Sequence, residues 1–196
     1  MVYLCYEVVF VVKEVLKRIA QCFADEHIIY GLGGSCVLVA YDILEDMRDI
    51  DIVVALEDIE RARYILESMA VLKCSGKNCL VENEYSYVYE LDGVEVELMS
   101  NIHIRHDEGL YTLPFSQKRV TYRMCIDDLM IPVMSLEDWY VFYQLIGKQE
   151  RVDQIEGWFL ENGITHGRYL INAIQANIPR QLKVDIVKTI QKMMLA

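Results

Sequence analysis

The stretch from Tyr30 to Ala55, YGLGGSCVLVAYDILEDMRDIDIVVA, constrains the fold of this chain more than any other segment. The glycine-rich residues 33–35 predict a tight turn at the end of a short apolar strand over 27–32. The apolar run over 36–45 predicts a short buried helix, and the segment 49–55 predicts a second strand. We therefore expect a strand, a turn, a helix and a strand in close succession.

Asp49 and Asp51 project to the same face of the second predicted strand, because residues two apart on a strand point the same way. Two neighbouring carboxylates repel each other unless a cation lies between them. Hard divalent cations such as Mg²⁺ take oxygen ligands of this kind and usually share them with substrate phosphates. The acid pair therefore predicts a magnesium site.

Gly33, Gly34 and Ser35 supply the second half of the predicted site. Backbone N–H groups at the start of a helix bind phosphate oxygens, and the helix dipole adds to this attraction. Each motif alone more often marks an ordinary strand-to-helix turn or a solvated strand face. A phosphate-binding turn followed by a metal-binding acid pair predicts a nucleotide site.

The rest of the chain predicts a mixed α/β (α+β) fold, in which a small mixed sheet is flanked by helices. Helices are expected at 6–24 and 56–69, a turn at 75–78, and a hairpin over 85–99 that reverses at Asp92-Gly93. Weaker patterns predict strands at 121–124 and 129–133. Later helices are expected at 135–147, 149–161, 165–176 and 180–195. We expect an α/β domain over 1–134 and a helical C-terminal lobe over 135–196.

Composition excludes several classes of protein. A net charge of −11 argues against general nucleic-acid binding, which usually needs a basic surface. No segment reaches the ~18 apolar residues of a membrane span. The six cysteines form no CxxC motif, which favours a reducing, cytoplasmic setting. The 54% content of hydrophobic residues predicts a packed core, and the oligomeric state stays open.

A third acid is expected beside the aspartate pair, and the strand at 94–99 offers Glu95 and Glu97 on one face. Here the chain resembles the DNA polymerase β-like nucleotidyltransferase superfamily, in particular its small stand-alone prokaryotic members. The resemblance rests on Gly34-Ser35, Asp49-Ile50-Asp51 and Val96-Glu97-Leu98-Met99. It extends weakly to 134–138 and to Gly147-Lys148, and covers roughly residues 30–163.

The resemblance implies an enzyme that moves a nucleoside monophosphate from a nucleoside triphosphate, with ATP the expected donor, to an unknown hydroxyl and releases pyrophosphate. Ser35 and the neighbouring backbone would hold the β- and γ-phosphates, and Asp49 and Asp51 would hold two Mg²⁺ ions. Glu97 would hold the metal that activates the hydroxyl. Many members carry aspartate at this third position, and Glu95 is the competitor. We favour Glu97 because a hydrophobic segment follows it, as in the family.

Two cations are weaker candidates for nucleotide binding. Arg48 either reaches a phosphate or pairs with a neighbouring carboxylate. Lys148 and Asp153 resemble the lysine-to-acid spacing that some relatives use near the triphosphate, and an ion pair on a helix surface is the competing interpretation. His103 and His106 have a spacing that could bind zinc on a helix, but we expect them on a loop.

The alternative function is a catalytically weak or inactive module of the same fold with a binding or regulatory role, for example in a toxin–antitoxin-like pair. The aspartate pair favours the enzyme, because binding alone would not require two repelling acids. The glutamate at the third position keeps the alternative open.

Overall fold

The protein is built around one large mixed β-sheet. The computed structural model describes residues 2–75 and 85–195, with side chains from Phe10 onward. The strands of this sheet follow the order β3-β4-β5-β2-β1-β9-β8. Their bounds are β1 Tyr30–Leu32, β2 Asp49–Val54, β3 Val71–Ser75, β4 Tyr85–Leu91, β5 Val94–Ser100, β8 Val120–Ile126 and β9 Leu129–Met134. The short hairpin of β6 (His103–His106) and β7 (Gly109–Thr112) forms a separate two-stranded sheet.

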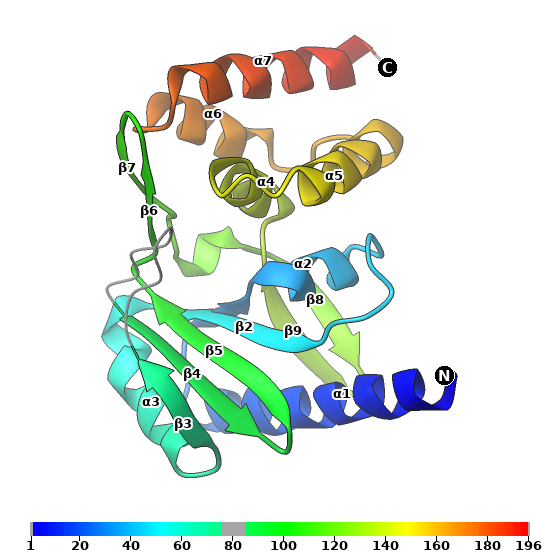
Figure 1. Ribbon diagram of the computed structural model, residues 1–196, viewed down its shortest axis with the longest axis vertical. Helices are drawn as coiled ribbons and strands as arrows, with labels where there is room; N and C mark the ends of the chain where they lie inside the picture. The colour runs from blue at the N-terminus through cyan, green and yellow to red at the C-terminus, as the bar shows by residue number, and fades with distance from the viewer. Residues whose placement is uncertain (1, 76–84, 196) are drawn as a thin grey trace.

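Helices cover both faces of the large sheet (Figure 1). On one face lie α1 (Val2–Asp25) and α3 (Ile59–Glu67), which contact each other. On the other face α2 (Gly34–Ala40) contacts α4 (Leu136–Leu145). The remaining helices are α5 Gln149–Asn162, α6 Gly167–Gln175, α7 Arg180–Leu195 and two short 3-10 helices, Leu56–Asp58 and Gln117–Arg119. The mixed α/β fold flanked by helices is thus confirmed.

Helix α1 fixes the central strands from one side. Leu16, Ile19 and Phe23 recur at three- and four-residue steps and are fully buried. The Phe23 ring meets the Tyr30 ring of β1 edge-on, with centroids 5.2 Å apart. None of the helices in the described part of the chain is long and apolar enough to cross a membrane.

Helix α2 is shorter than the predicted 36–45, because it ends in a left-handed residue. Asp42 has φ +56°, so the chain leaves the helix there. The Ile43 N–H donates to the Leu38 carbonyl at 2.8 Å and the Asp42 N–H to the Val39 carbonyl at 3.1 Å. This is the Schellman pattern that closes a helix. The residues after it form a loop that leads to β2.

The β6–β7 hairpin was not predicted, and the expectation that His103 and His106 lie on a loop is wrong. Ile104 pairs with Tyr111, and both are buried, which is the period-two signal that was missed. His103 Nδ1 lies 2.8 Å from Thr112 Oγ1, and His106 Nε2 lies 3.0 Å from the Asn177 carbonyl oxygen. The hairpin therefore contacts the turn before α7.

A buried ion pair joins the C-terminal helices to the sheet. Ser135 caps α4 by accepting from the Asp138 N–H at 3.1 Å. Arg119, next to β8, donates to Asp138 at 2.6 Å and lies over the Tyr169 ring of α6. Burial raises the pKa of Asp138 to about 6, against the opposing charge of Arg119. Because one hydrophobic core runs through the sheet and these helices, the division at 134/135 stays a prediction. The predicted turn residues 76–78 lie outside the described residues.

Candidate nucleotide site

The register of two central strands places four carboxylates on one face of the sheet. Strand β2 pairs with β5 in parallel, so that Asp49 lies opposite Glu95 and Asp51 opposite Glu97. The intervening Ile50 is fully buried on the other face. The structure therefore places the three acids that the sequence singled out on one face of two adjacent strands, with Glu95 on the same face.

Two of the four carboxylates, Asp51 and Glu97, have raised pKa values. Burial, together with the charges of Asp49, Glu97 and Glu95, raises the pKa of Asp51 to about 8. Burial also raises the pKa of Glu97, and a hydrogen bond from Ser86 opposes this shift. A cation bound among these groups would stabilise their charged forms.

The glycine turn lies directly against the acid strand. Gly34 has φ +51°, which favours glycine, and a Cβ atom there would overlap the Asp51 carboxylate. A Cβ at Gly33 would overlap the Trp139 ring of α4. The Ser35 hydroxyl donates to Asp49 Oδ1 at 3.0 Å, and the Gly33 N–H donates to the Asp51 carbonyl at 2.8 Å. Turn and acid pair thus form one unit.

The donor set suits a hard divalent cation, although the ligands are not gathered around one point. Across residues 2–75 and 85–195, no three His, Cys, Asp or Glu side chains are grouped closely enough to hold a metal ion. Hydrogen bonds hold two of the acids: Ser35 to Asp49, and Ser86 Oγ to Glu97 Oε1 at 2.8 Å. All the available donors are oxygens, the ligand type that Mg²⁺ prefers.

A cavity of about 410 Å³ opens beside Asp49 and Ser35. Arg48 lines it, and whether Arg48 contacts a phosphate or pairs with a neighbouring carboxylate stays a prediction. Lys148 does not line this cavity, whereas Arg151, one turn further along α5, does. The sequence analysis missed Arg151, because nothing local distinguishes it from a solvated helix residue.

Lys148 immediately precedes α5, and the expected surface ion pair with Asp153 is not seen among the described residues. The Asp153 carboxylate instead accepts a hydrogen bond from Gln149 Nε2 at 2.8 Å. The Lys148 N–H donates to the Tyr143 carbonyl at 2.9 Å. A role for Lys148 in nucleotide binding stays a prediction.

Tyr143 of α4 is a second group that sequence reasoning missed. Burial raises the pKa of its hydroxyl, and the charge of Asp51 adds to the shift while Arg151 opposes it. Trp139 and Tyr143 are four residues apart on one face of α4, with ring centroids 5.8 Å apart, and Trp139 lies against Gly33. The four-residue spacing of the two aromatic residues was the available signal in the sequence. Aromatic residues at this spacing on a helix, however, more often belong to the hydrophobic core than to a functional site.

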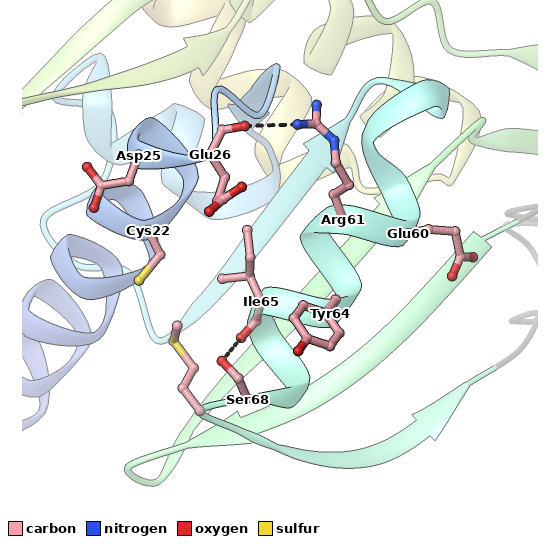
Figure 2. Close-up of a pocket in the computed structure, with 9 residues that line it drawn as sticks. Cys22, Asp25, Glu26, Glu60, Arg61, Tyr64, Ile65 and Ser68 are labelled. Atoms are coloured by element: carbon pink, nitrogen blue, oxygen red, sulfur yellow. Dashed lines mark hydrogen bonds between the residues drawn. The ribbon is translucent and has the colours of Figure 1, made fainter.

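A larger cavity, of about 520 Å³, lies away from this chemistry, between α1 and α3 on the opposite face (Figure 2). Two of its polar side chains, Arg61 and Ser68, are already bonded within the protein. Arg61 donates to the Glu26 carbonyl at 3.0 Å and pairs with Asp58, and the Ser68 hydroxyl donates to the Ile65 carbonyl at 2.6 Å. The cavity beside Asp49 is therefore the better candidate for a polar substrate.

The glycine-serine turn, the acid strand and the acids on its parallel neighbour are the features on which the predicted resemblance rests. A family model described as "uncharacterised nucleotidyltransferase" matches residues 15–169, so the chain belongs to that family. The predicted membership of the nucleotidyltransferase superfamily is thereby confirmed. A search of the curated proteins gave no match.

Solved structures show the same fold. TM1012 from Thermotoga maritima, described as a candidate nucleotidyltransferase, is 22% identical over 76% of this chain and 92% of its own, with a TM-score of 0.59. The solution structure of the antibiotic-resistance factor ANT(2″)-Ia is 13% identical over 85% of this chain and 92% of its own, with a TM-score of 0.60. Lincomycin-bound LnuA, a lincosamide antibiotic adenylyltransferase, is 16% identical over 72% of this chain and 94% of its own, with a TM-score of 0.50.

Proposed function

We propose that the protein is a Mg²⁺-dependent nucleotidyltransferase that moves a nucleoside monophosphate from a nucleoside triphosphate, with ATP the expected donor, to a hydroxyl and releases pyrophosphate. One observation carries the proposal: the β2–β5 register places Glu97 beside Asp51, on the face where Asp51 touches the glycine turn. This arrangement brings a phosphate-binding turn within reach of three acids, as in-line transfer at a phosphate requires.

Each group in the site has a role that follows from its chemistry. Ser35 and the turn backbone would donate to the terminal phosphates, and Arg48 and Arg151 would neutralise their charge from the cavity walls. Asp49, Asp51 and Glu97 would hold two Mg²⁺ ions. Bound Mg²⁺ would offset phosphate charge and lower the pKa of the attacking hydroxyl.

A small molecule is the acceptor that the structural neighbours favour. One structure of ANT(2″)-Ia, 12% identical over 77% of this chain and 89% of its own with a TM-score of 0.54, contains adenylyl-2″-tobramycin. LnuA is bound to lincomycin. The net charge of −11 also disfavours an RNA end. We therefore propose the hydroxyl of a small polar molecule as the acceptor class.

The proposal predicts linked binding of nucleotide and metal. A nucleoside triphosphate with Mg²⁺ should raise the melting temperature more than the sum of the two separate shifts, because the carboxylates repel a triphosphate without metal. A ligand at ~100 times its dissociation constant stabilises the native state by about 2.7 kcal/mol. That corresponds to several degrees, at about 2–4 °C per kcal/mol. Thermal scans of apo protein, Mg²⁺, triphosphate and both together measure the effect.

Two α5-side variants serve as a matched pair in the same scans. Arg151→Gln should remove most of the combined shift, because Arg151 lines the cavity, and Lys148→Gln should keep more of it. A larger loss of the combined shift in Lys148→Gln than in Arg151→Gln would instead assign the triphosphate contact to Lys148. Absence of any synergy with all four common nucleoside triphosphates would reject the enzyme and favour the binding or regulatory module.

The two glutamates of β5 should differ in their effect on catalysis. Glu97→Gln should lower kcat by about a hundredfold or more with little change in nucleotide affinity, because Glu97 would serve the hydroxyl-activating metal. Glu95→Gln should lower kcat less than Glu97→Gln does, since Glu95 lies opposite Asp49, at the start of β2. Steady-state kinetics combined with nucleotide titration separate the two effects. A larger kcat loss for Glu95→Gln would move the third-acid assignment to Glu95.

A further inference from the structure

A third cavity, of about 340 Å³, lies on the α1 side of the sheet, where β8 and β9 form its edge. The Tyr30 side chain points to this side, because Tyr30 pairs with Val54 of β2 and contacts Phe23 of α1. Asp49 and Asp51 occupy the opposite face. The cavity is therefore separate from the proposed nucleotide site.

The cavity wall combines an apolar floor with a few polar donors. The apolar part includes Ala20 and Ala24 of α1 and Leu129, Ile131 and Pro132 of β9. The polar part consists of the side chains of His27, Tyr30, Gln117 and Arg123. An apolar body with few convergent polar groups is the usual composition of a small-molecule site.

Among the residues that the structure describes, no aspartate or glutamate lines this cavity, although the chain has 30 acidic and 19 basic residues. Arg123 is exposed and forms no ion pair with any residue in the described ranges. The nearby Arg119, in contrast, pairs with Asp138. The cavity therefore carries local positive charge in an acidic protein, which favours an anionic ligand.

Tyr30 supplies a second polar group to the cavity wall. Its side chain is only 7% exposed, and its hydroxyl has no hydrogen-bond partner within the described part of the chain. Burial raises the pKa of this hydroxyl, and the charge of Arg123 opposes the shift. Tyr30 and Arg123 both line the cavity. An acceptor atom of a ligand would give the Tyr30 hydroxyl a hydrogen-bond partner there.

We propose that this cavity binds a small organic carboxylate. The Arg123 guanidinium and the Tyr30 hydroxyl contact the carboxylate head, and the apolar body lies over the α1 alanines and β9. A charge-assisted hydrogen bond from arginine supplies most of the affinity, and the tyrosine hydroxyl adds a neutral one. The volume of about 340 Å³ suits a body of the size of a single aromatic ring.

Fluorine NMR of 4-fluorobenzoate, with 4-fluorobenzamide as the neutral probe of the same shape, tests the site. The carboxylate should bind wild-type protein in the millimolar range or tighter, and the amide should bind at least about tenfold more weakly. Arg123→Gln should weaken carboxylate binding about tenfold, and Tyr30→Phe about three- to tenfold. Arg180→Gln, at a side chain that is 95% exposed and outside the cavity, should leave it unchanged.

Several results would overturn the proposal: no binding of 4-fluorobenzoate by wild-type protein, equal binding of the amide, or wild-type affinity in Arg123→Gln or Tyr30→Phe. Arg123 is exposed, so its variant should fold normally, and circular dichroism checks both variants. The probes bind without nucleotide or Mg²⁺, so failure here would leave the proposed transferase activity untouched.

Discussion

Asp49→Asn and Asp51→Asn are each expected to abolish nucleotidyl transfer while the fold stays intact. Both side chains lie on one face of β2 and are the proposed metal ligands, whereas Ile50 and Ile52 on the other face carry the packing. Loss of one metal-binding carboxylate should cost about a thousandfold in kcat/KM, which corresponds to about 4 kcal/mol of transition-state stabilisation. Transfer of a labelled nucleotide with Mg²⁺ present measures the loss.

Asp51→Asn should at the same time stabilise the metal-free protein, and increasingly so as the pH rises. The folded-state pKa of Asp51 is about 8, above its ordinary value of 3.8. Between these values the native protein holds a proton that the unfolded chain has released, so raising the pH lowers the free energy of unfolding. Asparagine does not ionise, so the variant should not lose free energy of unfolding in this way as the pH rises. The difference in melting temperature between variant and wild type should therefore grow from pH 5 to pH 8 in the presence of a chelator.

Asp128→Asn, which changes an exposed carboxylate in the β8–β9 turn, is the matched control and should alter neither activity nor the pH dependence. Near-wild-type transfer by either site variant would show that the metal assignment is wrong. A pH-independent stability difference for Asp51→Asn would show instead that Asp51 is ionised and solvated in the folded protein.

The parts of this protein that the sequence predicts are those in which polar and apolar residues alternate with the period of a strand or a helix. The alternation of Asp49, Ile50 and Asp51 sets the two faces of β2, and the same period in β5 presents Glu95 and Glu97 together. Sequence alone could not give their register. The structure supplies it by aligning Asp51 with Glu97.

The missed parts depend on packing between distant segments. Arg151 reaches the cavity because α5 lies beside the loop of Arg48, 103 positions earlier in the sequence. Tyr143 belongs to an aromatic run whose inward face depends on how α4 packs over the turn. Neither position has a local pattern that separates it from a surface cation or a core aromatic.

Gly34→Ala is expected to abolish both transfer and nucleotide binding. The added methyl would overlap the Asp51 carboxylate, so the turn and β2 would have to separate. The residue also needs φ +51°, which costs a non-glycine residue about 1 kcal/mol or more. We expect a drop of several degrees in melting temperature, loss of the combined triphosphate and Mg²⁺ shift, and transfer below detection.

Gly93→Ala separates backbone strain from the clash. Gly93 has φ +80°, but a Cβ there meets nothing within 4 Å. This variant should therefore lose some stability through strain and keep full transfer. If Gly93→Ala and Gly34→Ala lose stability equally and both stay active, the turn is not pressed against the acid strand.

The double variant Gly34→Ala/Asp51→Ala then tests the identity of the colliding group. Shortening Asp51 removes the carboxylate atoms that the new methyl would overlap. The double variant should therefore be more stable than Gly34→Ala alone, a positive coupling that only residues in contact show. It should still be inactive, because the proposed metal ligand Asp51 is gone. Recovery of stability without activity would show that residue 34 contacts residue 51 and that transfer requires the Asp51 carboxylate. Glycine would then be required at position 34 because a larger residue leaves no room for that carboxylate beside the turn.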